Sequence, residues 1–90
     1  LGSDGAWCFA AGRRIRAKVA VEHARNSVGA GDAFLAGFLL AFTRRQPLER
    51  CLRAAAACGA AATQAQWAGV IDPATVARLE ERVELSEEPT

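Results

Sequence analysis

The sequence predicts an α/β fold in which a β-hairpin comes first and three helices follow. Three observations support this prediction. From Arg14 onwards, basic and apolar residues alternate strictly, which is the period-two pattern of a half-buried strand. A glycine turn then opens an apolar run at residues 33–42, which is typical of a buried helix. Later, Asp72-Pro73 places a capping residue before a proline, a combination that marks the start of a helix.

The hairpin occupies the first fifth of the chain. Gly2-Ser3-Asp4-Gly5 forms a turn, because these residues tolerate positive φ angles, and the first strand follows at residues 6–10. A second turn at Ala11-Gly12 leads into the alternating strand, which starts at Arg14. The basic side chains of this strand could bind phosphate or simply face solvent. Alternation favours a solvated strand face, since it accounts for them without a ligand.

The first helix is expected from about Ala30 to Thr43. Because residues 33–42 are apolar all round, we expect this helix to be buried on most sides, between a sheet and other helices. The second helix is expected from about Leu48 to Gln64. Its many alanines let the backbone approach another element, or a flat ligand, closely.

The third helix runs from Asp72-Pro73 to about Arg82. Beyond it, Val83-Glu84-Leu85 predicts a short edge strand, and residues 86–90 predict a mobile acidic tail.

Composition excludes several classes of function. The 90 residues form one domain or a piece of one, and a hydrophobic content of 51% is too high for a disordered chain. A net charge of +1 argues against nucleic acid as a partner. Neither a signal peptide nor an apolar run long enough to cross a membrane is visible. The chain starts at Leu1 rather than methionine, so we expect a trimmed chain.

The cysteines point to a reducing compartment. Cys8, Cys51 and Cys58 form no C-x-x-C pair, so we expect no zinc site, and Cys51 and Cys58 have the spacing of small core residues on one helix face. The lack of a disulfide framework fits a cytoplasmic protein.

The most informative segment is Gly29-Ala30-Gly31-Asp32, which opens the first helix. A helix N-terminus presents backbone N–H groups without internal partners, and the helix dipole adds partial positive charge there. Glycines on both sides of Ala30 let a bulky anion approach the backbone. The turn therefore predicts a pocket for phosphate oxygens.

Asp32 allows two interpretations. In the first turn of a helix, a carboxylate beside a phosphoryl group can accept a proton from an attacking hydroxyl. It can equally do no more than cap its helix. The residues themselves leave both interpretations open, because short glycine-rich turns occur in many folds.

Residues 28–38, Val-Gly-Ala-Gly-Asp-Ala-Phe-Leu-Ala-Gly-Phe, resemble the C-terminal signature of the ribokinase-like, or PfkB, carbohydrate kinases. Residues 1–6 are similar to the strand-end turn of that family near the ATP phosphates, and residues 56–63 to its alanine-rich helix beside the adenine. The stretch 70–73 and the closing residues 83–85 look most like the branch of 1-phosphofructokinase and tagatose-6-phosphate kinase. The resemblance implies a three-layer α/β/α sandwich, of which residues 1–90 are the incomplete C-terminal, nucleotide-binding portion.

The resemblance also implies roles for individual residues in ATP-dependent phosphoryl transfer to a sugar or sugar phosphate. Asp32 would be the general base, and Gly29, Ala30 and Gly31 would supply the amides of the anion hole. The nucleotide would be held by a group of small residues: Gly2, Ser3, Gly5, Ala56 and Ala60. Magnesium would accompany ATP, with its ligands upstream of this chain. A potassium ion is a further expectation, near Asn26, Val28, Ala62 and Ala65.

One departure matters for these roles. Many family members have Asp-Thr before the glycine turn, where this sequence has Asn26-Ser27. The change favours the sugar-phosphate branch and weakens the potassium assignment. An alternative to the enzyme is a truncated, non-catalytic fragment that acts as a nucleotide-binding or packing module, and a homodimer is compatible with either.

Overall fold

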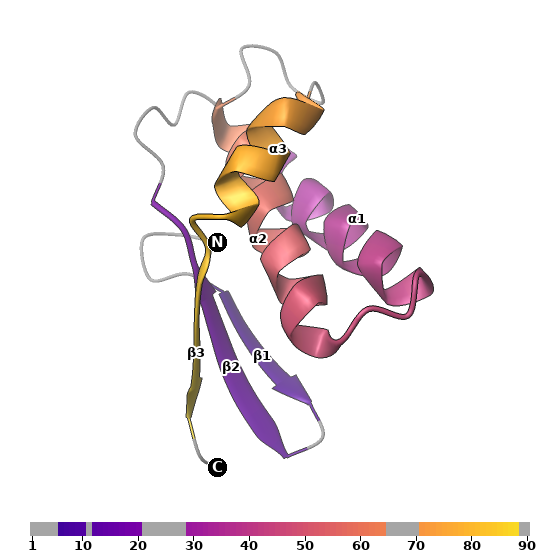
Figure 1. The fold of residues 1–90 in the computed structure, drawn as a ribbon, viewed down its shortest axis with the longest axis vertical. Coiled ribbons are helices and arrows are strands. Elements are labelled where there is room, and N and C mark those ends of the chain that lie inside the picture. Colours follow the sequence, from indigo (N-terminus) through magenta and orange to yellow (C-terminus); the bar gives the residue numbers. More distant parts are fainter. Residues whose placement is uncertain (1–5, 11, 21–28, 65–70, 89–90) are drawn as a thin grey trace.

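The computed structural model describes residues 6–10, 12–20, 29–64 and 71–88. Two strands come first, three helices follow, and a third strand ends the described part (Figure 1). In chain order the elements are β1 (Ala6–Ala10), β2 (Arg13–Lys18), α1 (Ala30–Thr43), α2 (Leu48–Gln64), α3 (Pro73–Glu80) and β3 (Glu84–Glu88). The predicted hairpin followed by three helices is therefore confirmed.

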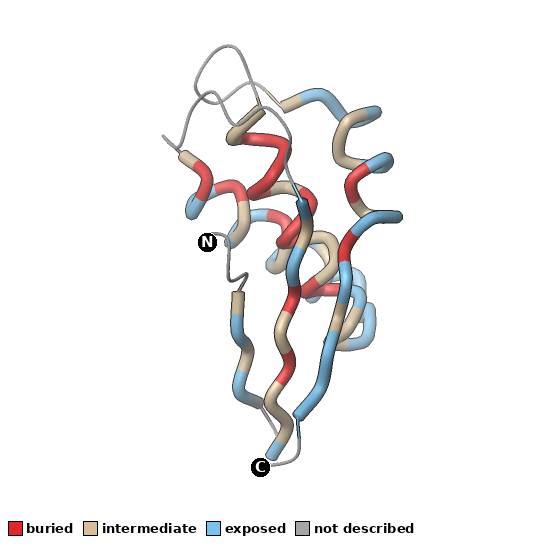
Figure 2. Tube along the Cα trace, turned by 90° about the vertical axis from the view of Figure 1, so that its left-hand side faces the viewer, coloured by how far each residue is buried: buried red, intermediate tan, exposed pale blue. Residues whose placement is uncertain are grey.

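The three strands form one antiparallel sheet in the order β1-β2-β3. Ile15 of the central strand lies opposite Cys8 of β1 and Glu87 of β3. Burial alternates along β2, where Ile15 and Ala17 are buried and their neighbours are less so (Figure 2). The period-two pattern of the sequence thus identified both the strand and its buried face.

The acidic residues 86–88 were expected in a mobile tail, and this expectation is wrong. They belong to β3, where Ser86 pairs with Arg16 and Glu88 with Arg14. Opposite charges on neighbouring strands compensate for the poor strand propensity of glutamate. Arg13 donates to Glu87 at 2.6 and 3.0 Å and to Glu49 of α2 at 2.9 Å, so one guanidinium joins the sheet to the helix.

Two of the basic residues contact aromatic rings on the outward face of the hairpin. The guanidinium carbon of Arg14 lies 4.5 Å from the ring centre of Trp7 and 5.7 Å from that of Phe9, and that of Arg16 lies 5.6 Å from Trp7. These are cation–π distances. The basic face that alternation predicted is therefore only partly solvated, because Arg14 and Arg16 are half-buried while Lys18 is exposed.

The hydrophobic core lies between the sheet and α2, with α3 closing one end. Alanines of α2 pack directly against β2 and let the helix approach the sheet closely. The core consists of Ile15, Ala17, Leu52, Ala56, Ala57, Ala60, Ala61, Leu79 and Val83. Cys51 is also fully buried, as its spacing predicted.

Two polar devices hold α3 in place. At its start, Asp72 accepts a hydrogen bond from the backbone N–H of Ala74 at 3.1 Å, with Pro73 in the first helical position, as the sequence predicted. At its end, Arg53 of α2 donates to the backbone carbonyls of Glu80 and Val83, both at 2.8 Å. The helix ends at Glu80, two residues before the predicted end.

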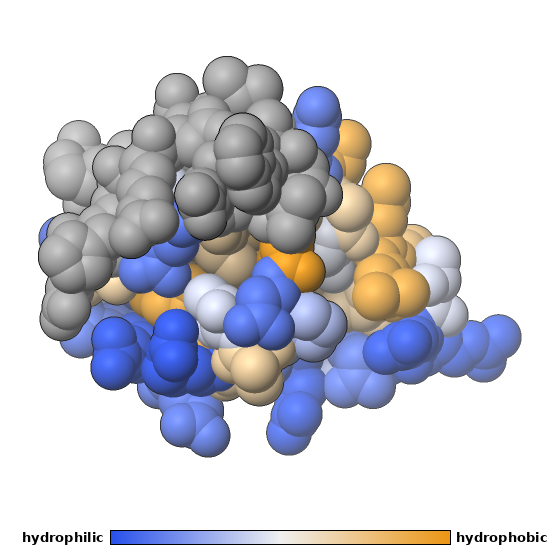
Figure 3. All heavy atoms as spheres, turned by 90° about the horizontal axis from the view of Figure 1, so that it is seen from above, coloured by the Kyte–Doolittle hydropathy of each residue, from blue (hydrophilic) through white to orange (hydrophobic). Residues whose placement is uncertain are grey.

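Helix α1 differs from expectation. Only Ala30, Ala33 and Gly37 are buried, and this stripe faces α2. The opposite side carries exposed apolar residues: Leu35, Leu39, Leu40 and Phe42. Seen from above, hydrophobic side chains gather where α1 lies (Figure 3). The expectation that the helix is buried on most sides is therefore wrong for the described part of the chain, because α2 covers one side of it only.

Within the described ranges, the helices are all too short or too polar to cross a bilayer.

Candidate functional site

Gly29 forms the turn that opens α1. Its backbone is left-handed, with φ 82° and ψ 0°, and it occupies the N-cap position of the helix. Its carbonyl accepts the first helical hydrogen bond, from the N–H of Ala33 at 2.8 Å. The N–H groups of residues 29–32 consequently have no acceptor within the helix. They point along the axis at its positive end, which is the arrangement that binds anions.

Gly31 explains why the turn suits a bulky ligand. A β-carbon placed on Gly31 would meet no atom of the described residues within 4 Å, and the φ of Gly31 lies outside the left-handed region. Neither backbone conformation nor packing in the described structure therefore requires glycine here. Glycine nevertheless costs a helix about 1 kcal/mol relative to alanine. The missing side chain instead leaves room for a group that approaches the amides from outside.

Asp32 lies in the first turn of α1 and is exposed. It is not the N-cap residue, because Gly29 holds that position. The simplest form of the capping interpretation therefore does not apply. An exposed carboxylate one residue after Gly31 can reach a ligand held by the same amides.

The structure brings Ala62 to this turn. Ala62 of α2 is 5% exposed and packs in one cluster with Ala30 and Ala33, against which the half-buried Cys58 and Ile71 also pack. The C-terminal part of α2 thus lies beside the first turn of α1. This places one member of the predicted potassium site next to residues 29–32, which we call the anion turn.

Ala56 and Ala60 lie elsewhere. They are 2% and 6% exposed, and they pack in the core beside the sheet rather than in the cluster around the turn. Their predicted place beneath an adenine stays a prediction. The remaining predicted site residues fall outside the described ranges: Gly2, Ser3, Gly5, Asn26, Val28 and Ala65.

Sequence reasoning missed the contact between Gly37 and Cys58. A β-carbon placed on Gly37 would lie 2.8 Å from Sγ of Cys58 and 3.0 Å from the carbonyl oxygen of Ala54. A glycine inside an apolar helical run was the available signal, since such a glycine indicates close packing. Burial raises the pKa of the Cys58 thiol, and the nearby Glu80 carboxylate adds to the effect. The thiol is therefore neutral at physiological pH.

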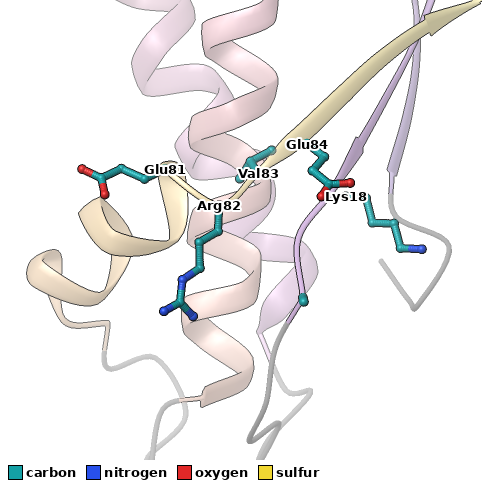
Figure 4. Close-up of a pocket in the computed structure, with 6 residues that line it drawn as sticks. Lys18, Glu81, Arg82, Val83 and Glu84 are labelled. Carbon is teal, nitrogen blue, oxygen red and sulfur yellow. The ribbon is translucent and has the colours of Figure 1, made fainter.

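A separate hollow of about 620 Å³ lies where α3 turns into β3, beside the end of β2 (Figure 4). Side chains of both charges surround it, and Glu81 points away from the others. Its lining consists of Lys18, Ala20, Glu81, Arg82, Val83 and Glu84. Since this lining includes no predicted site residue and favours neither charge, the anion turn remains the best candidate site.

Comparison with known proteins gives a consistent family. The family model described as "pfkB family carbohydrate kinase" matches residues 1–75. Among curated proteins, the acarbose 7(IV)-phosphotransferase of an Actinoplanes species is 49% identical over 55 residues, which are 59% of this chain and 18% of that protein. The chain spans about a fifth of the length of the curated relatives it matches.

Solved structures share the fold. A "putative phosphofructokinase" of Staphylococcus aureus matches with a TM-score of 0.90 and 25% identity, over 99% of this chain and 28% of that chain. Phosphofructokinase-2 of Escherichia coli, solved in complex with potassium, matches with a TM-score of 0.82 and 25% identity, over 90% of this chain and 26% of that chain. The expected ribokinase-like α/β fold is confirmed by these matches.

Proposed function

This chain belongs to the pfkB family of carbohydrate kinases, and we propose that it forms the C-terminal, phosphate-binding portion of an enzyme that phosphorylates a sugar or sugar phosphate with ATP. The observation that carries the proposal is the space that the described residues leave beside Gly31, at the end of a helix whose first amides have no internal partner. A phosphoryl group fits that combination of open space and aligned donors.

The amides of Gly29, Ala30 and Gly31 donate hydrogen bonds to the oxygens of the phosphoryl group while it is being transferred. Negative charge spreads over those oxygens in the transition state, so fixed donors stabilise it more than the ground state. The amides need not reorganise during the reaction, because the helix holds them in place. Magnesium bound with ATP would supply further charge neutralisation, and no residue of this chain is assigned as its ligand.

Asp32 acts as the general base in this proposal. Its carboxylate takes the proton of the sugar hydroxyl as the hydroxyl oxygen bonds to the γ-phosphorus and the bond between that phosphorus and the bridging oxygen breaks, with ADP as the leaving group. The exposed position of Asp32 beside the anion turn supports this role.

The proposal also assigns residues to the nucleotide and to a monovalent cation. We assign the ATP phosphates to Gly2, Ser3 and Gly5, and the adenine to the small residues Ala56 and Ala60 of α2. We assign potassium to backbone oxygens near Asn26, Val28, Ala62 and Ala65. Support for the cation comes from the position of Ala62, which packs against the first turn of α1.

The decisive experiment compares Asp32→Asn with the wild type in the full-length protein. Loss of a general base lowers kcat by about 10²–10⁴-fold, and ATP binding should be kept. Asp72→Asn is the matched control, because Asp72 caps α3 and asparagine caps equally well. Near-normal turnover in Asp32→Asn would show that Asp32 is not the base.

The substrate is found by screening the full-length protein against a small panel. The panel contains fructose 1-phosphate, fructose 6-phosphate, tagatose 6-phosphate and ribose, together with acarbose because of the Actinoplanes relative. Gly31→Ala adds a second test of the site, since its methyl group would fill the open space without disturbing the fold. We expect kcat to fall in this variant while the free energy of unfolding is kept or rises.

A further inference from the structure

At one place along their contact, helices α1 and α2 pack more closely than a β-carbon on α1 would allow. The β-carbon position of Gly37 lies 2.8 Å from Sγ of Cys58, 3.0 Å from the carbonyl oxygen of Ala54 and 3.1 Å from Cβ of Cys58. Carbon atoms in proteins pack at about 3.5–4.0 Å. A β-carbon at position 37 would therefore displace Sγ of Cys58 and force the α2 backbone at Ala54 to give way by a few tenths of an ångström.

Among the described residues, α1 is held by its contact with α2 and by the half-buried Phe34 and Phe38, which pack against the main core. Its buried residues, Ala30, Ala33 and Gly37, all lie on the side that faces α2, and its other sides are exposed or half-buried. The position of α1 is consequently set by how deeply it rests on α2.

The same side chain reaches both the middle and the start of α1. Cys58 contacts the Gly37 position, and it also packs against the cluster formed by Ala30, Ala33 and Ala62 under the anion turn. Asp32 and Gly37 are five residues apart, which is about 7.5 Å along a helix. Because a helix is stiff over that length, a shift at Gly37 moves Gly31 and Asp32 with it.

We propose that Gly37 and Cys58 form a positioning contact for phosphoryl transfer, which places the anion-hole amides and the Asp32 carboxylate at the correct height above α2. This inference rests on the proposed function. Neither residue touches the substrate. They act through α1, and because a misplacement of about 1 Å lowers a rate about a hundredfold, a shift of a smaller size lowers it by less.

The test measures kcat and KM of the full-length enzyme on whichever sugar the panel identifies. Gly37→Ala should lower kcat by up to about tenfold. KM for ATP and for the sugar should change less than about twofold, because the displaced groups act on the transition state. Cys58→Ser preserves the size of the side chain and should keep kcat, whereas Cys58→Leu should lower it as Gly37→Ala does.

The double variant Gly37→Ala/Cys58→Ala gives a sharper readout. Removing Sγ relieves the 2.8 Å overlap but leaves the one with the Ala54 carbonyl at 3.0 Å. We therefore expect it to recover part of the kcat lost in Gly37→Ala. A contact that serves stability alone would not produce this recovery in turnover per folded molecule.

Ile15→Val is the matched control for stability. Ile15 is 1% exposed in the core beside α2 and is not among the atoms that meet the Gly37 position, so the change destabilises the fold without altering that contact. Its kcat should be that of the wild type. If Gly37→Ala does not fold, Cys58→Leu and Cys58→Ser decide between the outcomes.

The possible failures can be told apart. If the wild type is active and depends on Asp32, but folded Gly37→Ala and Cys58→Leu both keep full kcat, the positioning contact is wrong and the proposed function stands. If the wild type transfers no phosphoryl group to any sugar of the panel, the proposed function fails, and the inference fails with it.

Discussion

The β-carbon position of Gly37 lies 2.8 Å from Sγ of Cys58, whereas the same position on Gly31, six residues earlier in α1, has no neighbour within 4 Å among the described residues. The two glycines of α1 thus have opposite surroundings. At Gly37 the neighbouring helix occupies the space, and at Gly31 none of the described residues occupies it.

Alanine substitutions at the two glycines should have different effects on the free energy of unfolding. Overpacking costs about 1–3 kcal/mol, and the higher helix propensity of alanine returns up to about 1 kcal/mol. We therefore expect Gly37→Ala to lower the free energy of unfolding, while Gly31→Ala leaves it unchanged or raises it. Urea denaturation followed by circular dichroism measures both. Equal effects at the two positions would contradict the packing difference.

Gly29 should be replaceable only at a cost. Its φ of 82° lies in the left-handed region, where a residue with a β-carbon loses about 1–2 kcal/mol. We expect Gly29→Ala to lose about that much stability and Gly29→Asn to lose less, because asparagine tolerates this conformation. Thermal denaturation of the two variants gives the order, and a Gly29→Ala protein as stable as the wild type would refute it.

The Arg13–Glu87 ion pair should make β3 sensitive to acid and to salt. The hydrogen bond from Arg13 holds the pKa of Glu87 below its ordinary value. A carboxylate with a lowered pKa stabilises the fold fully above its ordinary pKa of about 4.3, and that stability is lost as the pH falls through the lowered value.

The measurement is the urea midpoint as a function of pH and of sodium chloride. The midpoint of the wild type should fall below about pH 4.3 and on addition of salt. Arg13→Met should have a lower midpoint at neutral pH and a flatter dependence on both. An identical pH profile in the variant would show that the ion pair contributes nothing, as many exposed pairs do.

Replacing Arg53 should lower the stability of the fold far more than replacing Arg50 on the same helix. Arg53 donates to the carbonyls of Glu80 and Val83, each at 2.8 Å, and these bonds join α2 to the turn between α3 and β3. Loss of hydrogen bonds from a charged group costs about 1.5–3 kcal/mol. Arg53→Met should lose about this much stability and speed hydrogen exchange in β3, whereas exposed Arg50→Met should do neither.

Local patterns predicted much of the fold. Alternation from Arg14 identified the buried face of β2, and Asp72-Pro73 identified the start of α3. Both are short-range signals whose physical cause lies within a few residues of the chain. The glycine turn was found in the same way, because a helix N-terminus depends on its own first residues.

The features that sequence reasoning missed depend on distant partners. Residues 86–88 have poor strand propensity and become a strand because Arg13 and Arg14 lie across from them, more than 70 positions earlier. The burial of α1 depends on what covers it, and an apolar helix does not carry that information. The fit of Gly37 against Cys58 likewise needs the crossing of two helices, which single-sequence patterns do not specify.

The acidic edge formed by β3 has a consequence for solubility. An outer strand presents unpaired backbone groups on which a second molecule can build. Three of the five residues in β3 are glutamates, so a second copy added there would bring like charges together. The other outer strand of the described sheet, β1, reads Ala-Trp-Cys-Phe-Ala and has no such charges. Within the described sheet, β1 therefore offers less charge repulsion than β3 to the addition of another strand.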